Sequence, residues 1–208
     1  MAYRLALFDF DGVLADSAGW FSAQLPDLAS RHGFVAPDAK GLERLRRLPS
    51  RQILKEFKVS PLRLPAIAAD LRRRMAADAA SIRLFAGVPD LMSDLRDAGV
   101  RLAVVSSNSE ANVRAVLGAQ AGLISAYSCG AALFGKSTRF RHLLGRYELD
   151  ADQACVVGDE VRDIEAAHKA GLPAAAVGWG YGAPEALAAA VPDFLARSPE
   201  ELRQFLTR

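Results

Sequence analysis

Residues 5–17, LALFDFDGVLADS, run from a short apolar stretch into a turn that carries several carboxylates. The apolar run from Leu5 to Phe10 lacks polar alternation and closes on polar residues and glycine. This pattern is typical of a parallel strand that is buried on both faces. The stretch therefore predicts the first strand of an α/β fold.

Two aspartates, Asp9 and Asp11, stand one residue apart where this strand ends. Ligands of open parallel sheets bind beyond the carboxyl ends of the strands, so both carboxylates are expected to reach one crevice. Two carboxylates held this close resist ionising together unless a cation neutralises them. Gly12 permits a sharp turn and a close approach of backbone to ligand. The structural alternative is a turn that only caps the next element.

Similar apolar runs and helix-period stretches alternate along the rest of the chain. The runs are Val100 to Val105, Ala154 to Val157 and Ala174 to Val177, with a weaker one from Ala126 to Gly130. The amphipathic stretches are Val88 to Ala98, Glu110 to Leu117, Thr138 to Tyr147 and Val161 to Ala170. Strands that alternate with helices predict right-handed βαβ units and a doubly wound parallel sheet. Gly99 and Gly171 are expected to end two of the helices.

One segment, from about Asp16 to Arg83, contains no convincing strand. It predicts three or four helices, punctuated by Pro26, Pro37, Pro49, Pro61 and Pro65. We expect residues 1–15 and 84–208 to form the core domain and residues 16–83 to form a helical cap domain. An insert directly after the first strand is expected to lie over the strand ends.

Bulk composition excludes several classes of protein. The chain has 208 residues, 51% hydrophobic and 24% charged, with a net charge of +2, so no nucleic-acid or membrane partner is expected. Two cysteines, Cys129 and Cys155, are too few for a disulfide framework. We expect a cytoplasmic protein, since no signal peptide or membrane-length apolar stretch is present.

Polar residues also follow the other predicted strands. Ser106, Ser107 and Asn108 follow the second run, Lys136 begins a helix, and Asp159, Glu160 and Asp163 follow the run that ends at Val157. Each has a structural alternative: helix capping for the first group, exposure for the lysine, and a helix-dipole interaction for the acids. Together, hard carboxylate oxygens suit Mg²⁺, and a lysine neutralises phosphate charge. An aspartate can then serve as the nucleophile through an aspartyl-phosphate.

Four segments of the chain resemble the motifs of the haloacid dehalogenase superfamily. They are DFDGVLADS, VVSS, the lysine of GKSTRF, and GDEVRD, in the order and strand-end context of that family. The resemblance spans nearly the whole chain. The helical insert is similar to the small-cap type found in phosphoglycolate phosphatase and β-phosphoglucomutase. One departure is Ser137, which stands where many phosphoglycolate phosphatases have proline.

This resemblance implies a role for each motif residue. Asp9 is implied as the nucleophile, Asp11 as the general acid and base, Ser106 as a phosphate ligand and Lys136 as the charge-stabilising group. Mg²⁺ is implied on Asp9, the Asp11 carbonyl and Asp159, with Asp163 and Glu160 acting through waters. Substrate contacts are expected from Phe10, Gly12, Ser107, Asn108, Trp20 and Arg47. The choice between Ser106 and Ser107 as the phosphate ligand stays open.

Several functions fit these residues. The first is hydrolysis of a small phosphorylated metabolite by a monomer or small homo-oligomer. A sugar phosphomutase would use the same aspartyl-phosphate but return the phosphoryl group. A non-catalytic phospholigand-binding protein is less favoured, because Asp9, Asp11, Lys136 and Asp159 are all present. A dehalogenase needs no metal and typically lacks the second aspartate, which Asp11 supplies here.

Overall fold

A parallel sheet organises the computed structural model, which describes residues 2–48, 52, 56, 59–130 and 135–208. Its six described strands lie in the order β5-β4-β1-β6-β7-β8. Their bounds are Leu5–Phe8 (β1), Arg101–Val105 (β4), Ile124–Ser128 (β5), Ala154–Gly158 (β6), Ala174–Val177 (β7) and Phe194–Ala196 (β8). All neighbouring pairs are parallel, so the predicted α/β class is confirmed.

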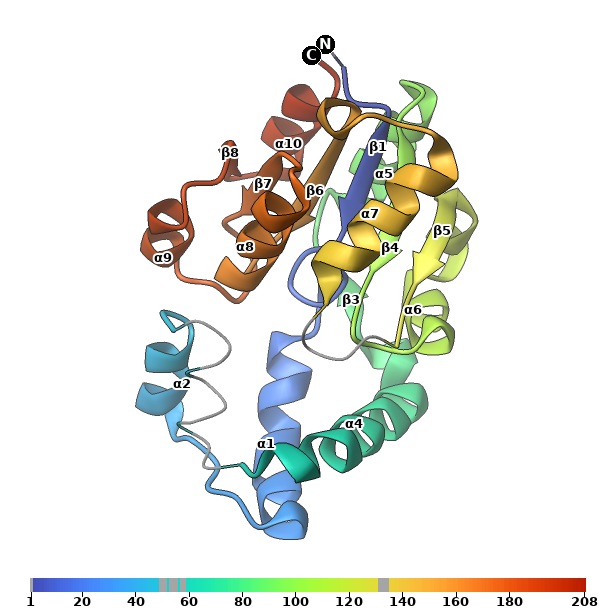
Figure 1. Ribbon diagram of the computed structural model, residues 1–208. Coiled ribbons are helices and arrows are strands. Elements are labelled where there is room, and N and C mark those ends of the chain that lie inside the picture. Colours follow the sequence, from blue (N-terminus) through green and yellow to red (C-terminus); the bar gives the residue numbers. More distant parts are fainter. Residues whose placement is uncertain (1, 49–51, 53–55, 57–58, 131–134) are drawn as a thin grey trace.

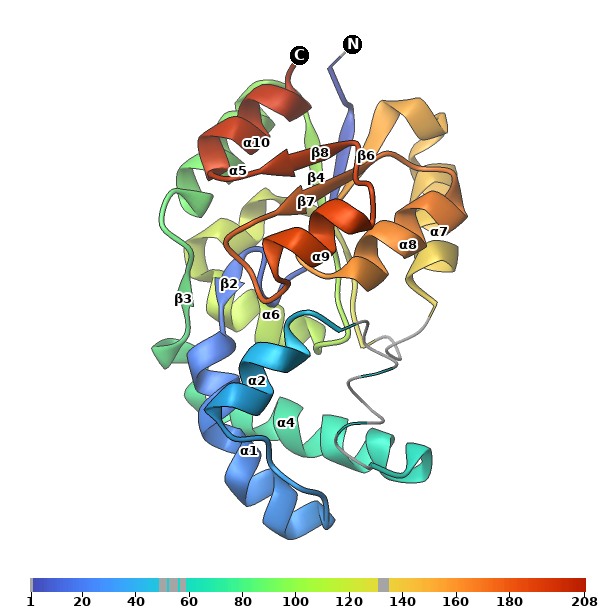
Figure 2. The same ribbon diagram turned by 90° about the vertical axis from the view of Figure 1, so that its left-hand side faces the viewer.

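Helices cover both faces of the sheet (Figures 1 and 2). One face carries α5 (Val88–Asp97), α6 (Glu110–Leu117) and α10 (Pro199–Leu206); the other carries α7 (Lys136–Tyr147), α8 (Val161–Ala170) and α9 (Pro184–Ala189). Along β1, Ala6 and Phe8 pack on the first set, while Leu5 and Leu7 pack on the second. Burial on both faces explains why this strand shows no polar alternation.

Most predicted bounds agree with the structure, and the exceptions have local causes. The bounds of α6 and α8 are as predicted, and Gly171 ends α8 in the left-handed conformation. Helix α7 begins at Lys136, where a helix start was predicted and two residues before the amphipathic stretch from Thr138; Gly135, with a φ of 109°, directly precedes it. Strand β5 lies two residues earlier than predicted. The short strand β8 was not predicted.

The helical segment, as we call residues 16–83, lies beyond the carboxyl ends of the strands (Figure 1). Its described helices are α1 (Ala18–His32), α2 (Ala39–Leu45) and α4 (Leu64–Asp78). The chain enters and leaves it through an antiparallel pair, β2 (Ala15–Asp16) and β3 (Arg83–Leu84). This pair corrects the expectation of no strand here, because two-residue strands have no detectable period.

Short 3₁₀ turns connect several of these elements. They span Pro61–Arg63, Ala79–Ser81, Gly118–Leu123 and Ala151–Gln153. Pro26, expected to end a helix, lies inside α1. The predicted break at Pro49 falls outside the described residues. Within the described part of the chain, every helix is too short or too polar to cross a bilayer.

Candidate active site

The site lies where the strand order reverses. Strand β1 is followed by β4 on one side, whereas its other neighbour β6 is followed by β7 on the opposite side. Such a switch point opens a crevice at the carboxyl ends of the strands. Asp9 comes directly after β1 and Asp159 directly after β6, and both side chains are buried. The local strand ends therefore bring residues from distant parts of the chain to one place.

A buried lysine joins two of the carboxylates. The Lys136 Nζ lies 2.6 Å from Asp9 Oδ2 and 2.7 Å from Asp163 Oδ1. Burial opposes the charge of Lys136, but the carboxylates of Asp163 and Asp9 raise its pKa above the usual value. Burial likewise opposes ionisation of Asp163, yet the ammonium of Lys136 lowers the pKa of that carboxyl. Lys136 and Asp163 thus form a charged pair.

One carboxylate oxygen of Asp9 is hydrogen-bonded to the backbone of the next residue: the N–H of Phe10 donates to Asp9 Oδ1 at 2.8 Å. Burial raises the pKa of Asp9, and the attraction of Lys136 only partly offsets this. A further cation close to Asp9 would favour its ionised form.

Three buried carboxylates meet at this point. Asp9, Asp159 and Asp163 each offer an oxygen, and these oxygens lie within 4.8 Å of one another. Asp159 Oδ2 accepts a hydrogen bond from the N–H of Tyr181 at 2.7 Å, while Asp159 Oδ1 has no partner among the described residues. A buried carboxylate oxygen left unpaired is costly. Burial, followed by the nearby carboxylates, raises the pKa of Asp159 well above its usual value.

The charges around this triad fit a divalent cation. Lys136 contacts two of the three carboxylates, but its single positive charge neutralises only one of their negative charges. The adjacent Glu160 is already paired with Arg162. Carboxylate oxygens are the ligands that Mg²⁺ prefers, so the donor set suits this ion. Glu160 also accepts a backbone hydrogen bond at the start of α8, as part of a capping box with Asp163.

Backbone packs tightly around Asp159. A Cβ on Gly12 would lie 2.1 Å from Asp159 Oδ2, and a Cβ on Gly180 would lie 2.3 Å from the Asp159 Cβ. Gly12 also has a φ of 81°. The sequence predicted that the backbone at Gly12 approaches a ligand; in the structure the Asp159 side chain lies against Gly12. No larger residue fits at Gly12 without displacing the triad.

Asp11 lies at the edge of the crevice and has its own hydrogen-bond partners. The Ser17 hydroxyl donates to Asp11 Oδ1 at 2.7 Å, and Asn108 Nδ2 lies 3.4 Å from Asp11 Oδ2. The Tyr181 hydroxyl lies 2.6 Å from Ser17 Oγ. Burial raises the pKa of Asp11 to about 6. A carboxyl with this pKa can exchange a proton near neutral pH.

The polar residues after β4 border the same crevice. Ser106 is buried, and its Oγ accepts from the N–H of Asn108 at 3.0 Å, which leaves its hydroxyl proton to donate elsewhere. Ser107 is half-buried, and its carbonyl accepts from Arg72 Nε at 3.2 Å. The helix cap of α6 is Ser109, whose Oγ accepts from the N–H of Asn112 at 3.2 Å.

A cavity of about 960 Å³ separates the crevice from the helical segment. Asp11, Ser107 and Asn108 line it at the crevice, and Trp20 lines it from α1. The Trp20 indole N–H donates to Asp78 Oδ2 at 2.9 Å. Side chains from α1, α2 and α4 supply most of the remaining wall.

Three of the predicted substrate contacts, Phe10, Gly12 and Arg47, are not among the described residues that line the cavity. The Phe10 side chain is fully buried in the core, so only its backbone reaches Asp9. Arg47 points outward, with a side chain 64% exposed and 3.9 Å from Glu43, and it is absent from the described cavity wall. The neighbouring Arg46 lines the cavity and donates to the Tyr181 carbonyl at 2.8 Å.

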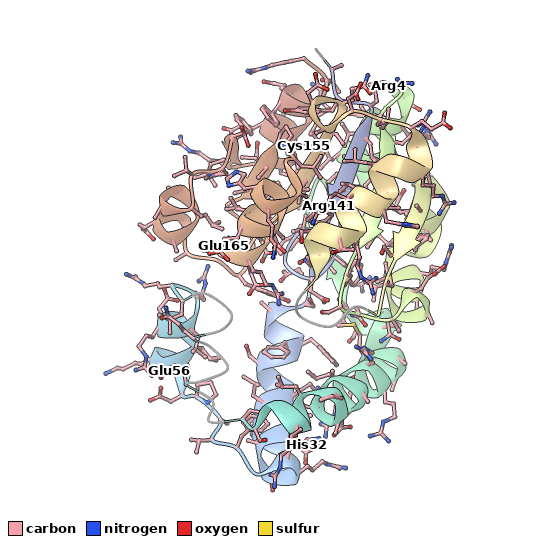
Figure 3. All side chains as sticks on the ribbon, viewed as in Figure 1. Arg4, His32, Glu56, Arg141, Cys155 and Glu165 are labelled. Atoms are coloured by element: carbon pink, nitrogen blue, oxygen red, sulfur yellow. The ribbon has the colours of Figure 1, made fainter. Side chains whose placement is uncertain are left out.

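Other residues with polar or reactive side chains lie away from the crevice. His32 lies in the helical segment far from the strand ends and contacts Asp70 at 3.1 Å (Figure 3). Cys155 is buried within β6. Their position agrees with the absence of these residues from the motifs.

Ser17 and Tyr181 were not predicted as site residues. Ser17 belongs to the quoted stretch DFDGVLADS, and Tyr181 lies in GWGYG after β7, so both follow strands. Nothing in the local pattern indicates that residues 164 positions apart share a hydrogen bond. Only the packing of the loop after β7 against the segment that follows β1 brings them together.

Known proteins with sequences similar to this chain include a phosphatase and a kinase. A phosphoglycolate phosphatase from Synechococcus elongatus is 34% identical over 204 residues, 97% of this chain and 96% of that protein. Tyrosine-protein kinase PtkA from Mycobacterium tuberculosis is 29% identical over 86% of this chain and 63% of its own length.

Structural comparison adds a predicted phosphatase from Clostridium acetobutylicum. It superposes with a TM-score of 0.84 at 23% identity, over 99% of each chain. The family model of haloacid dehalogenase-like hydrolases matches residues 6–177. The resemblance carried by the four motifs is therefore confirmed, and the chain belongs to the haloacid dehalogenase-like hydrolase family.

Proposed function

We propose that this enzyme hydrolyses a small phosphomonoester through an aspartyl-phosphate on Asp9. Its family and its phosphoglycolate phosphatase relatives support assignment as a phosphoric monoester hydrolase. The observation that carries the proposal is the buried triad of Asp9, Asp159 and Asp163, joined to Lys136 through Asp9 and Asp163. These groups combine a nucleophile with the charges that a phosphoryl group requires.

Each residue then has a chemical task. Asp9 attacks phosphorus through one carboxylate oxygen, and Lys136 attracts the phosphoryl oxygens close to it. The Ser106 hydroxyl donates a hydrogen bond to the same phosphoryl group. Asp11 protonates the leaving oxygen, and later removes a proton from the water that hydrolyses the aspartyl-phosphate. A carboxyl with a pKa of about 6 is suited to both transfers.

The triad would hold Mg²⁺ through Asp9 and Asp159, with the Asp11 carbonyl as a further ligand and Asp163 and Glu160 acting through waters. When bound, the ion supplies charge neutralisation for the phosphoryl group and the carboxylates. The unpaired Oδ1 of Asp159 supports this assignment.

We propose that the helical segment acts as a cap domain on the core formed by residues 1–15 and 84–208. The leaving group would occupy the cavity between them, in contact with Ser107, Asn108 and Trp20. A cap that closes over the crevice excludes bulk water during phosphoryl transfer. The substrate class is a small phosphorylated metabolite, as the name of the phosphoglycolate phosphatase relative indicates for that protein.

The test is turnover of p-nitrophenyl phosphate and of a panel of phosphorylated metabolites by the wild type and by Asp9→Asn. We expect Asp9→Asn to lower kcat about a thousandfold or more, because the nucleophile is lost. EDTA should stop the wild-type enzyme, and Mg²⁺ should restore it.

The matched control is Asp97→Asn, which makes the same change at an exposed position on α5. It should keep wild-type turnover. Substantial activity of a folded Asp9→Asn variant would exclude Asp9 as the nucleophile. A sugar phosphate returned as its isomer, without release of inorganic phosphate, would indicate a phosphomutase instead.

A further inference from the structure

Tyr181 connects three parts of the site. Its backbone N–H donates to Asp159 Oδ2 at 2.7 Å, and its carbonyl accepts from Arg46 Nε at 2.8 Å. Its side-chain hydroxyl lies 2.6 Å from Ser17 Oγ. One residue therefore contacts the carboxylate triad, the helical segment and the hydroxyl that holds Asp11.

The direction of the side-chain hydrogen bonds follows from proton counting. The Ser17 hydroxyl carries one proton and donates it to Asp11 Oδ1 at 2.7 Å. Ser17 Oγ can then only accept from Tyr181, so the Tyr181 hydroxyl is the donor. The result is a chain of donation from Tyr181 to Ser17 to Asp11.

This chain distinguishes the two oxygens of Asp11. Oδ1 is held by Ser17, whereas Oδ2 lies 3.4 Å from Asn108 Nδ2, a residue that lines the cavity. As long as Ser17 donates to Oδ1, a proton carried by Asp11 belongs on Oδ2, the oxygen on the side of the proposed leaving group. Ser17 is itself 1% exposed, so packing limits the alternatives open to its hydroxyl.

We propose that Tyr181, acting through Ser17, is a positioning residue that orients the Asp11 carboxyl for proton transfer to the leaving oxygen. The inference rests on the proposed phosphatase function and deepens it. Correct orientation of the general acid matters most when the leaving oxygen is strongly basic, because such a group departs only with a proton. A weakly basic leaving group departs without one.

The test compares two kinds of ester with wild type and Tyr181→Phe. One is p-nitrophenyl phosphate, whose leaving group is a weak base. The other is whichever of glycerol 2-phosphate, ribose 5-phosphate and 2-phosphoglycolate the wild type hydrolyses fastest, each having an alkoxide leaving group. The measured quantity is kcat/KM, which covers the steps up to phosphoryl transfer and leaves out hydrolysis of the aspartyl-phosphate.

We expect Tyr181→Phe to lower kcat/KM for the alkyl ester about tenfold, a part of the usual contribution of general acid catalysis. For p-nitrophenyl phosphate, kcat/KM should stay within about twofold, while kcat and KM fall together as hydrolysis of the aspartyl-phosphate slows. Phenylalanine keeps the backbone N–H that contacts Asp159, so the Mg²⁺ concentration for half-maximal activity should not change.

A second variant, Ser17→Ala, tests the same chain at its next link. It should show the same loss with the alkyl ester, and adding Tyr181→Phe to it should cause no further loss, since both changes break one pathway. The control is Tyr127→Phe, which removes a hydroxyl that donates to the Ala121 carbonyl away from the crevice. It should match the wild type with both esters.

Equal losses of kcat/KM with both esters, or additive losses in the double variant, would overturn the positioning role while leaving the phosphatase function intact. A raised Mg²⁺ requirement in Tyr181→Phe would do the same, by showing action through Asp159. A wild type that hydrolyses none of the esters would overturn both proposals. If Tyr181→Phe does not fold, Ser17→Ala carries the test with the same expected result.

Discussion

The two sides of the crevice differ in how tightly their residues are held. On the core side, Asp9, Lys136 and Asp163 are at most 7% exposed and are joined by contacts of 2.6 and 2.7 Å. On the other side, the helical segment borders a cavity of about 960 Å³; Arg46 contacts Tyr181 at one edge of it, while Met75 of α4 packs in the same hydrophobic cluster as the sheet. The charged groups proposed for phosphoryl transfer thus belong to the rigid sheet. The proposed leaving-group side is the wall of a cavity that helices α1, α2 and α4 line.

Among substitutions that test this difference, the largest effect is expected from Lys136→Met, which removes the buried ammonium group from the core side. We expect kcat to fall about 10²–10³-fold, because phosphoryl charge is no longer stabilised. The free energy of unfolding should fall by about 3–5 kcal/mol, because two buried carboxylates lose their partner. Mg²⁺-saturated kinetics and urea unfolding measure the two quantities.

The matched control is Lys169→Met, which removes an exposed lysine from α8. It should leave both quantities close to wild type. If Lys136→Met behaved like Lys169→Met, the core side would not depend on the buried ion pair, and the contrast between the two sides would fail.

A smaller effect is expected from the protonation of Asp11 in protein treated with EDTA. The pKa of Asp11 is raised from 3.8 to about 6, chiefly by burial, so the folded state binds the proton more tightly than the unfolded state. Its contribution to stability is therefore present below about pH 4 and is lost as the pH rises through about 6. The shift corresponds to up to about 3 kcal/mol.

Asp11→Asn isolates this contribution, because an amide does not titrate in this range. Relative to Asp11→Asn, the wild type should lose free energy of unfolding as the pH rises from about 4 to above 6. Urea unfolding at a series of pH values measures this difference. A difference between the two proteins that is constant with pH would show that the folded protein does not raise the pKa of Asp11.

The smallest effect is expected on the helical side, from the pair Arg46→Ala and Arg47→Ala. Arg46 holds the loop after β7 through the Tyr181 carbonyl, so its loss should raise KM about fivefold, or about 1 kcal/mol after solvent screening. Arg47 is 64% exposed, and its removal should change KM by less than about twofold. Steady-state kinetics with one alkyl phosphate ranks the two, and the reverse order would place the substrate near Arg47.

Much of the core could be predicted because its signals are local. Asp9 and Asp159 follow buried apolar runs, and the end of a strand is recognisable from the residues on either side of it. The bounds of α6 and α8 agree with the prediction because each helix has an apolar face of helical period. Strand β8 lacked such a signal, since three residues show no period.

The helical side was harder to predict because it depends on how helices dock. Arg46 and Arg47 are adjacent, and successive residues near a helix end point about 100° apart. Which of them faces the crevice depends on the contact of α2 with the loop after β7, where Ala183 N–H donates to the Arg46 carbonyl. The sequence carries no signal for that contact.

The amino-acid sequence by itself determined which charged groups stand at the strand ends and in what order, because a strand and its end are local features. It identified the family through those same residues. The tertiary structure alone decided which oxygen meets which donor, including the link from Tyr181 through Ser17 to Asp11. That link joins segments 164 residues apart, and its geometry depends on the packing of whole elements, which no short stretch of sequence encodes.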